Sequence, residues 1–253
     1  MPTACRSLLL LALVVWMPAF AEETCTARTG PSAQPLVELY TSEGCSSCPP
    51  ADRWLSQALQ QGAGRVNWLA FHVDYWDSIG WPDRFASPAY SRRQEARVAA
   101  TGARAVYTPQ VIVGSKTNAP WRNPASFREM LDSQSGPASA GLALRLLPQA
   151  NGGSLLMLGA APAGTPSAPA QVWVAQYQDD QVTAVRGGEN KGTTLRHDRV
   201  VRRLLGPWPM ARTALTRSMT IEPLAGPWGL VAFVQDAQGR TLQSLTLPAS
   251  SCQ

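Results

Sequence analysis

The chain has little charge and almost no histidine. Charged residues make up 15% of its 253 residues, and His72 and His197 are the two histidines. A structural zinc site needs four ligands, usually cysteine and histidine, so zinc binding is disfavoured. The basic residues are scattered singly or in pairs, such as Arg92 and Arg93, and do not form the long run that nucleic-acid binding favours. We therefore expect no nucleic-acid partner and give the net charge of +5 no functional meaning.

Long apolar runs are also missing after the first 21 residues, where no stretch approaches the roughly 20 apolar residues of a membrane helix. The chain starts with MPTACRSLLLLALVVWMPAFA, which has one arginine, an apolar run over residues 8–17, and small residues at Ala19 and Ala21. Signal peptidase accepts this pattern. We expect a signal peptide over residues 1–21 and a periplasmic or secreted protein without an integral membrane segment.

Four cysteines remain once such a signal is removed: Cys25, Cys45, Cys48 and Cys252. An even number in an oxidising compartment indicates pairing, and three connectivities are possible. Cys45 and Cys48 are positioned for each other by their spacing. Because chain termini often lie close together, we hypothesise a structural disulfide between Cys25 and Cys252. The alternative is that these two thiols are free or separately paired.

Strand and helix patterns alternate from residue 36 to about residue 134. The expected strands are residues 36–41, 66–75 and 108–114, and the expected helices are residues 50–60, 88–102 and a segment that begins at Asn123 and Pro124. After the linker SQSGPASAG, short β-rich runs follow at intervals typical of an all-β sandwich. We predict an α/β domain over residues 22–135 and a β-sandwich domain over residues 136–253.

The stretch ELYTSEGCSSCPPAD places Cys45 and Cys48 between a strand and a helix. The N-terminus of a helix favours a thiolate over a thiol, which indicates Cys45 as a nucleophile. Cys48 lies one helical turn further and would resolve the mixed disulfide. Ser46 and Ser47 between them leave the direction of exchange open.

The order of strand, CxxC, helix and a later Thr-Pro before a strand resembles the thioredoxin-like superfamily. The resemblance covers about residues 36–133 and implies a thioredoxin-like α/β fold. It implies that Pro109 is cis and shapes the site, and that Thr108 docks an extended substrate. We place Tyr107 and Trp76 with Thr108 as candidate substrate-binding residues. The segments ELYTSEGCSSCPPAD, FHVDYWD, YTPQ and RGGENKG are similar to the uncharacterised exported bacterial family called domain of unknown function 1223.

Two further side chains are candidates for the site. The resemblance implies a proton-accepting carboxylate on the strand before the cysteines, and Glu38 occupies that strand. The alternatives are a solvated edge residue or a core ion pair. His72 and Asp74 share one face of the next strand by period two. His72 is a candidate base or metal ligand, or a satisfied half-buried histidine.

The expected function is that of an exported thiol-disulfide oxidoreductase with Cys45, Cys48, Pro109 and Glu38 as catalytic residues. It would act without a cofactor on thiols or disulfides of exported proteins, with an unknown electron partner. One alternative is a non-catalytic binding module in which the CxxC forms a structural disulfide. The other is a copper-handling protein with Cys45, Cys48 and His72 as ligands. RGGENKG is expected to be a polar loop that faces the first domain.

Overall fold

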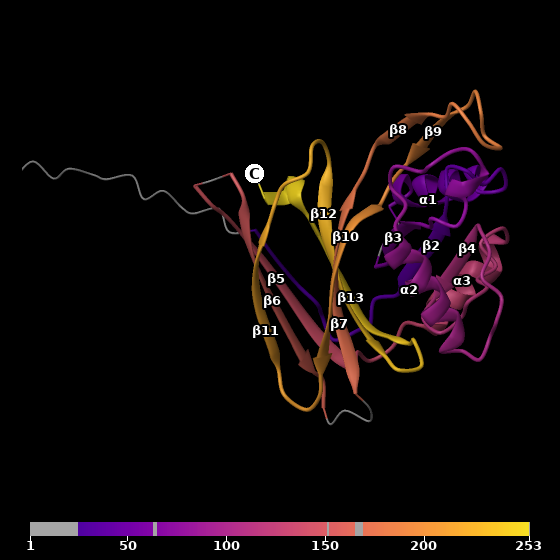
Figure 1. Cartoon of the computed structure of the whole chain (residues 1–253). Coiled ribbons are helices and arrows are strands. Elements are labelled where there is room, and N and C mark those ends of the chain that lie inside the picture. Colours follow the sequence, from indigo (N-terminus) through magenta and orange to yellow (C-terminus); the bar gives the residue numbers. More distant parts are fainter. Residues whose placement is uncertain (1–24, 63–64, 151, 165–168, 253) are drawn as a thin grey trace, which may run out of the picture.

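The computed structural model describes residues 25–62, 65–150, 152–164 and 169–252 (Figure 1). The signal peptide expected over residues 1–21 lies outside these ranges. Within them, no helix is long and apolar enough to cross a membrane.

Seven strands from both halves of the chain form one sheet, in the order β13-β12-β7-β10-β3-β2-β4. The prediction of a thioredoxin-like α/β domain followed by a separate β-sandwich is therefore wrong, and the protein is mostly β. The strands from the first half are β2 (Leu36–Thr41), β3 (Asn67–His72) and β4 (Gln110–Val113). Those from the second half are β7 (Ala170–Gln178), β10 (Val200–Met210), β12 (Trp228–Asp236) and β13 (Thr241–Pro248).

The two halves of this sheet meet where β10 runs parallel to β3. Val200 lies opposite Ala70, and the Ala70 N–H donates to the Arg199 carbonyl oxygen at 2.8 Å. An open edge of β3 would leave backbone groups unpaired, and β10 covers it. The sequence pattern predicted these strands but not this partner, because side-chain alternation reports the buried face of a strand and carries no information about its neighbour.

A second sheet packs against the β13, β12 and β7 side of the first. It has the order β1-β5-β6-β11, with β1 (Cys25–Arg28), β5 (Ala140–Pro148), β6 (Ser154–Pro162) and β11 (Leu215–Ile221). The N-terminal strand thus belongs to the C-terminal half, with Cys25 opposite Leu146. Cys25 is disulfide-bonded to Cys252, which ends the short helix η2 (Ala249–Cys252), and their Cα atoms are 4.7 Å apart. The predicted disulfide is confirmed.

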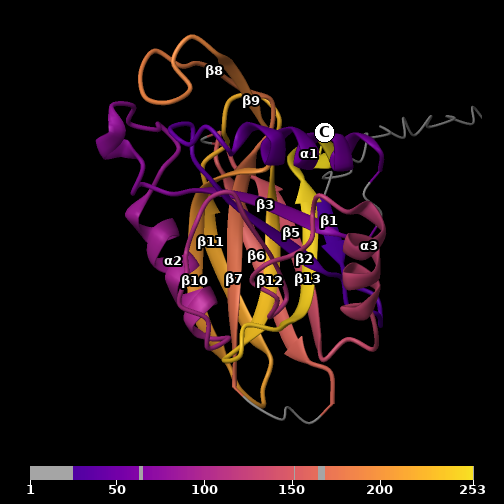
Figure 2. The ribbon, with the colours of Figure 1, turned by 90° about the vertical axis from the view of Figure 1, so that its right-hand side faces the viewer.

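Three α-helices cover the β2, β3 and β4 part of the large sheet in the described residues (Figure 2). They are α1 (Pro49–Gln60), α2 (Pro88–Ala99) and α3 (Pro124–Ser133). Each begins with proline, and Ser87 and Asn123 cap α2 and α3 by accepting backbone N–H groups. α1 and α3 pack on the face of Val37 and Leu39, whereas α2 packs on the opposite face.

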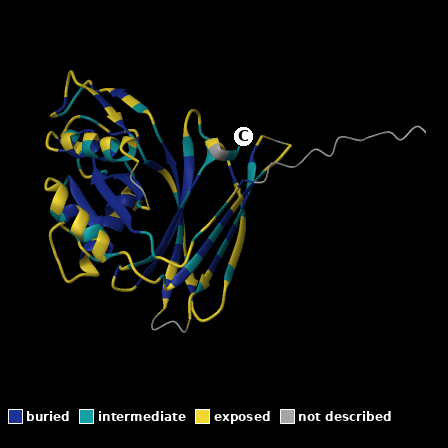
Figure 3. Cartoon of the chain, turned by 180° about the vertical axis from the view of Figure 1, so that it is seen from behind, coloured by how far each residue is buried: buried dark blue, intermediate teal, exposed yellow. Residues whose placement is uncertain are grey.

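Burial follows from this arrangement of layers (Figure 3). β12 is buried on both faces because successive side chains point to opposite sides of a strand. Leu230, Ala232 and Val234 pack in the core between the two sheets, while Val231 and Phe233 pack in the core beneath α2. The large sheet is therefore the shared centre of the molecule.

A separate two-stranded hairpin connects β7 to β10. Its strands are β8 (Gln181–Ala184) and β9 (Thr194–His197). The hairpin extends from the large sheet and lies beside α1 (Figure 1). The Ser56 hydroxyl on α1 donates to the Asp198 carboxylate at 2.5 Å. The hairpin thereby brings part of the C-terminal half into contact with α1.

Candidate functional site

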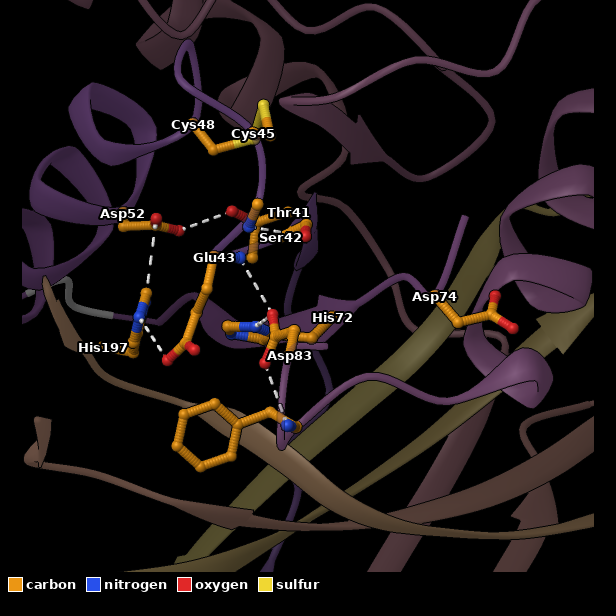
Figure 4. Close-up of polar contacts among 12 residues, drawn as sticks. Thr41, Ser42, Glu43, Cys45, Cys48, Asp52, His72, Asp74, Asp83 and His197 are labelled. Atoms are coloured by element: carbon orange, nitrogen blue, oxygen red, sulfur yellow. Dashed lines mark hydrogen bonds and ion pairs between the residues drawn. A yellow bond between two sulfur atoms is a disulfide. The ribbon is translucent and has the colours of Figure 1, made fainter. Parts of the chain in front are cut away.

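The cysteine pair lies in the turn between the end of β2 and the start of α1 (Figure 4). Cys45 and Cys48 form a disulfide with Cα atoms 5.4 Å apart, and both residues are fully buried. Cys48 is the N-cap residue of α1 and Pro49 takes the first helical position. An N–H at that position has no partner within a helix, so proline is tolerated there. The motif thus forms the strand, turn and helix that the sequence predicts.

The three candidate substrate-binding residues lie together beside this turn. The Thr108–Pro109 peptide bond is cis, as the resemblance implied. The Ser47 hydroxyl donates to the Thr108 carbonyl oxygen at 3.3 Å, and the Trp76 indole N–H donates to the Thr108 hydroxyl at 2.7 Å. Tyr107 directly precedes Thr108 and is 40% exposed. One side of the cysteine turn therefore carries an accessible aromatic residue next to Thr108.

Glu38 lies in a buried ion network. Its carboxylate accepts from Arg93 at 2.8 Å, lies 3.1 Å from Arg97 Nε, and accepts from Gln235 and the Tyr40 hydroxyl at 2.9 Å each. Burial works to raise the pKa of Glu38, but the two arginines outweigh it and lower the pKa to about 2. Glu38 therefore forms the core ion pair that was the alternative to a proton shuttle, and neither cysteine is among its hydrogen-bond or ion-pair partners.

His72 and Asp74, which the sequence placed on one face, are not brought together. The Asp83 carboxylate accepts from His72 Nδ1 at 2.6 Å, whereas the Asp74 carboxylate accepts from the Ser91 hydroxyl on α2. Figure 4 shows Asp74 well apart from the histidine. The reason is that β3 ends at His72, so the period of two no longer applies at Asp74.

His72 and Asp83 perturb each other. Burial works to lower the pKa of His72, but the charge of Asp83 outweighs it and raises this pKa above its usual range. Burial likewise works to raise the pKa of Asp83, and His72 lowers it to about 2. The pair is therefore held as a buried imidazolium and carboxylate.

This pair is part of a buried cluster of three carboxylates and two histidines under the cysteine turn (Figure 4). We call it the acid-histidine cluster. His197 Nε2 lies 3.4 Å from Glu43 Oε1, and His197 Nδ1 lies 3.7 Å from Asp52 Oδ2. The rings of His72 and His197 have centroids 4.9 Å apart. The members are Glu43, Asp52, His72, Asp83 and His197.

The carboxyls of Glu43 and Asp52 respond oppositely to this environment. Burial raises the pKa of Asp52 above its usual range, and the charge of His197 opposes this shift without cancelling it. Burial also works to raise the pKa of Glu43, but contacts with His197 and other donors outweigh it and lower the pKa. Asp52 therefore retains a proton to higher pH than an ordinary aspartate, whereas Glu43 is held ionised.

The donors of this region do not make a metal centre. Within the described ranges, no group of three or more histidine, cysteine, aspartate and glutamate side chains is arranged to hold a metal ion. His72 uses Nδ1 for Asp83. The copper set of Cys45, Cys48 and His72 is accordingly not assembled as a metal site.

The loop between β8 and β9 holds the cysteine turn from the other side. Asn190 is buried, and its side-chain amide donates to the carbonyl oxygens of Glu43 at 2.8 Å and Cys45 at 2.9 Å. The exposed Glu189 carboxylate accepts the Ser46 backbone N–H at 2.9 Å. The polar loop expected from RGGENKG is thus a direct neighbour of the cysteines.

Sequence reasoning did not connect His197, Glu189 and Asn190 with the site. The available signal was the glycine pair of RGGENKG. A Cβ at Gly187 would lie 2.3 Å from the Gly80 carbonyl oxygen, in the loop after β3, so the two backbones approach as only glycine allows. A glycine required by close approach marks a tertiary contact but does not identify its partner.

Comparisons with known proteins give a family and a fold. A family model described as "Protein of unknown function (DUF1223)" matches residues 36–235. No curated protein is similar to the sequence. The solved structure of protein AGR_C_4864 from Agrobacterium tumefaciens has a TM-score of 0.65 at 24% identity and covers 87% of this chain and 96% of that chain. The structure of HBP35 of Porphyromonas gingivalis has a TM-score of 0.62 at 14% identity. The match covers 86% of this chain and 75% of that chain. Both likenesses concern the fold alone.

Proposed function

The chain belongs to the DUF1223 family of unknown function, and we propose that this protein is an exported thiol-disulfide oxidoreductase. Its substrates would be thiols or disulfides of other exported proteins. The reaction uses the two cysteine sulfurs and needs no bound cofactor. An electron partner, a second protein dithiol or disulfide, would return the pair to its starting state.

The observation that carries the proposal is the contact between the cysteine turn and Thr108. Ser47, between the two cysteines, bonds to the Thr108 carbonyl oxygen. A substrate chain that lies along Thr108 would therefore pass next to the sulfurs. In this assignment Cys45 attacks the substrate sulfur, Cys48 attacks Cys45 to release the product, and Pro109 shapes the site.

Two features support export to an oxidising compartment, the periplasm or the exterior. Cys25–Cys252 and Cys45–Cys48 are both paired, and disulfides persist in such compartments, whereas cytosolic thiols are kept reduced. The expected signal peptide over residues 1–21 points the same way.

Trapping of the mixed disulfide tests this proposal. A Cys48→Ser protein retains Cys45 but has no resolving thiol, so it should accumulate a covalent adduct with a disulfide-containing protein such as insulin. The adduct is detected by non-reducing electrophoresis and mass spectrometry. The matched Cys45→Ser protein should form much less adduct, because the remaining thiol, Cys48, is the resolving one in this assignment.

The opposite result would support the binding-module alternative. If neither variant forms an adduct, and dithiothreitol leaves the Cys45–Cys48 bond of the folded wild-type protein intact, the disulfide is a structural link in the turn. Both cysteines are fully buried, and the sulfurs of a catalytic pair must become accessible to substrate. Reaction with dithiothreitol in the folded protein therefore separates a catalytic pair from a structural one.

A further inference from the structure

We infer that the cysteine turn as a whole, with Glu189 contributing a negative charge, disfavours a thiolate on Cys45, and that the pair is therefore an electron donor that reduces substrate disulfides. This inference rests on the proposed function, because it assigns a direction to the exchange at the same two sulfurs. Three observations carry it: the use of the backbone amides around the pair, the position of the Glu189 charge, and the absence of a compensating cation in the contacts of the turn.

The amides that normally favour a thiolate at a helix start are occupied or missing. Pro49 and Pro50, at the first two positions of α1, have no N–H. The N–H groups of Ala51 and Asp52 both donate to the Cys48 carbonyl oxygen, at 2.8 and 3.2 Å. Neither is therefore free to donate to a sulfur.

The amides inside the turn are used in the same way. The Cys48 N–H donates to the Cys45 carbonyl oxygen at 3.2 Å, and the Ser46 N–H donates to Glu189. The side-chain amide of Asn190, which reaches the turn from the loop, donates to carbonyl oxygens. Among the backbone N–H groups from Ser46 to Asp52, only that of Ser47 donates no hydrogen bond.

Glu189 also adds a negative charge to this place. Its carboxylate is exposed, and the hydrogen bond from the Ser46 amide lowers its pKa below the usual value, so it is ionised at neutral pH. Within the described ranges, no lysine or arginine side chain forms a hydrogen bond or ion pair with residues 45–48. Glu43 and Asp83 below the turn have lowered pKa values as well, and His72 compensates one of these charges.

A thiolate on Cys45 is thus opposed by a nearby carboxylate and lacks the backbone donors of a helix start. The Ser47 hydroxyl oxygen lies 3.3 Å from Cys45 Sγ, but its proton is donated to the Thr108 carbonyl oxygen. Dithiol pairs become strong oxidants when their reduced form is stabilised, so a pair without that stabilisation is reducing. We expect the pKa of the Cys45 thiol to be higher than that of a cysteine whose thiolate accepts such donors. A thiolate of higher pKa is intrinsically the stronger nucleophile. The Cys45–Cys48 pair therefore gives electrons more readily than it takes them.

The balanced reaction consumes the dithiol. The Cys45 thiolate forms a bond to one sulfur of a substrate disulfide, and the other substrate sulfur leaves as a thiolate and takes up a proton. Cys48 then loses its proton and forms a bond to Cys45, which releases the second substrate thiolate. Two electrons and two protons pass to the substrate, and a partner dithiol restores the pair by the reverse sequence.

The Glu189→Gln variant tests the inference, because glutamine retains an oxygen that accepts the Ser46 N–H while it removes the charge. We expect the pKa of the Cys45 thiol, followed by the pH dependence of its alkylation, to fall by about one unit. In glutathione buffers, the equilibrium constant for reduction should rise by less than twofold at pH 7 and by several-fold at pH 9, and the rise approaches tenfold only at a pH where the wild-type thiolate is the main species. Tenfold corresponds to about 30 mV for this two-electron couple.

The Glu129→Gln variant is the matched control. It removes the same charge from an exposed position on α3 and should leave both measurements unchanged. The wild-type pair should equilibrate with glutathione mainly as the disulfide.

Three results would count against this assignment. If the pair exchanges with glutathione but Glu189→Gln behaves as Glu129→Gln does, the role of Glu189 is refuted while the proposed function remains. A wild-type pair that equilibrates mainly as the dithiol overturns the direction. If the pair does not exchange at all, both proposals fail.

Discussion

The Glu38→Gln substitution tests whether the buried ion network holds the two halves of the chain together. Glu38 lies on β2 and bonds to Arg93 on α2 and to Gln235 on β12, which belongs to the C-terminal half. Glutamine keeps the size of the side chain but replaces one accepting oxygen with an amide nitrogen that donates. It leaves Arg93 and Arg97 buried without a counter-charge.

The expected loss of unfolding free energy follows from the pKa shift of Glu38 and from the cost of an unpaired buried charge. The pKa of Glu38 falls from 4.5 to about 2, a difference of 2.5, which corresponds to roughly 3 kcal/mol at 1.36 kcal/mol per unit. Removal of one partner from a buried ion pair costs about 3 to 5 kcal/mol. We therefore expect the free energy of unfolding to fall by about 3 kcal/mol, a large part of the roughly 5 to 15 kcal/mol of a typical domain.

The assay is urea unfolding followed by tryptophan fluorescence, with the midpoint shifted and the slope unchanged. Glu129→Gln is again the control, and it should change stability by less than about 0.5 kcal/mol. The depressed pKa means that the contribution of Glu38 is present above pH 4.5 and is lost as the pH falls toward 2. The two proteins should therefore converge in stability in acid.

A loss below about 1 kcal/mol at neutral pH would refute this account of the network. The same variant decides between the two roles considered for Glu38. An ion pair in the core predicts that the pH dependence of thiol exchange is retained in Glu38→Gln, whereas a proton shuttle predicts that it changes.

Two further substitutions test the disulfide and the acid-histidine cluster. Cys25→Ser should lower the free energy of unfolding by about 2 to 5 kcal/mol, because Cys25–Cys252 closes a loop with a sequence separation of 227; an equal urea midpoint for variant and wild type would contradict this. Asp83→Asn should flatten the pH dependence of stability in two windows. The contribution of Asp83 is present above pH 3.8 and lost as the pH falls toward 2, while that of His72 is present below pH 6.5 and lost as the pH rises through its higher folded pKa. Thermal unfolding from pH 2 to pH 9 measures both, and parallel curves for the two proteins would contradict the pairing.

Local patterns in the sequence predicted the elements well. Ser87 and Pro88 indicated the start of a helix, and in the structure the Ser87 hydroxyl accepts the Ala89 N–H at the beginning of α2. The strand at residues 36–41 has the predicted bounds. These signals are local, since capping and side-chain period depend on neighbours within one or two turns. The pairing of β10 with β3 depends on which strand edges remain free after the chain collapses, so no local pattern reveals it.

The same distinction applies to the site. Cys45, Cys48 and Thr108 became candidates because the motif itself carries them, and Glu38 became one because it occupies the strand before the cysteines. Its partners had a weaker signal: Arg93 and Arg97, four residues apart, lie on one side of α2 and both are buried. Contacts such as His197 with Asp52 arise only when the hairpin folds over α1.

The position of β1 governs the order in which the protein can assemble. During synthesis the strand Cys25–Arg28 appears first, but its partner β5 begins at Ala140, and the thiol of Cys25 must wait for Cys252. Long separations of this kind slow folding, because the entropy of closing the loop is lost before any contact compensates for it. The Cys25–Cys252 disulfide can form only after residue 252 has been made, and until then Cys25 can meet Cys45 or Cys48 instead.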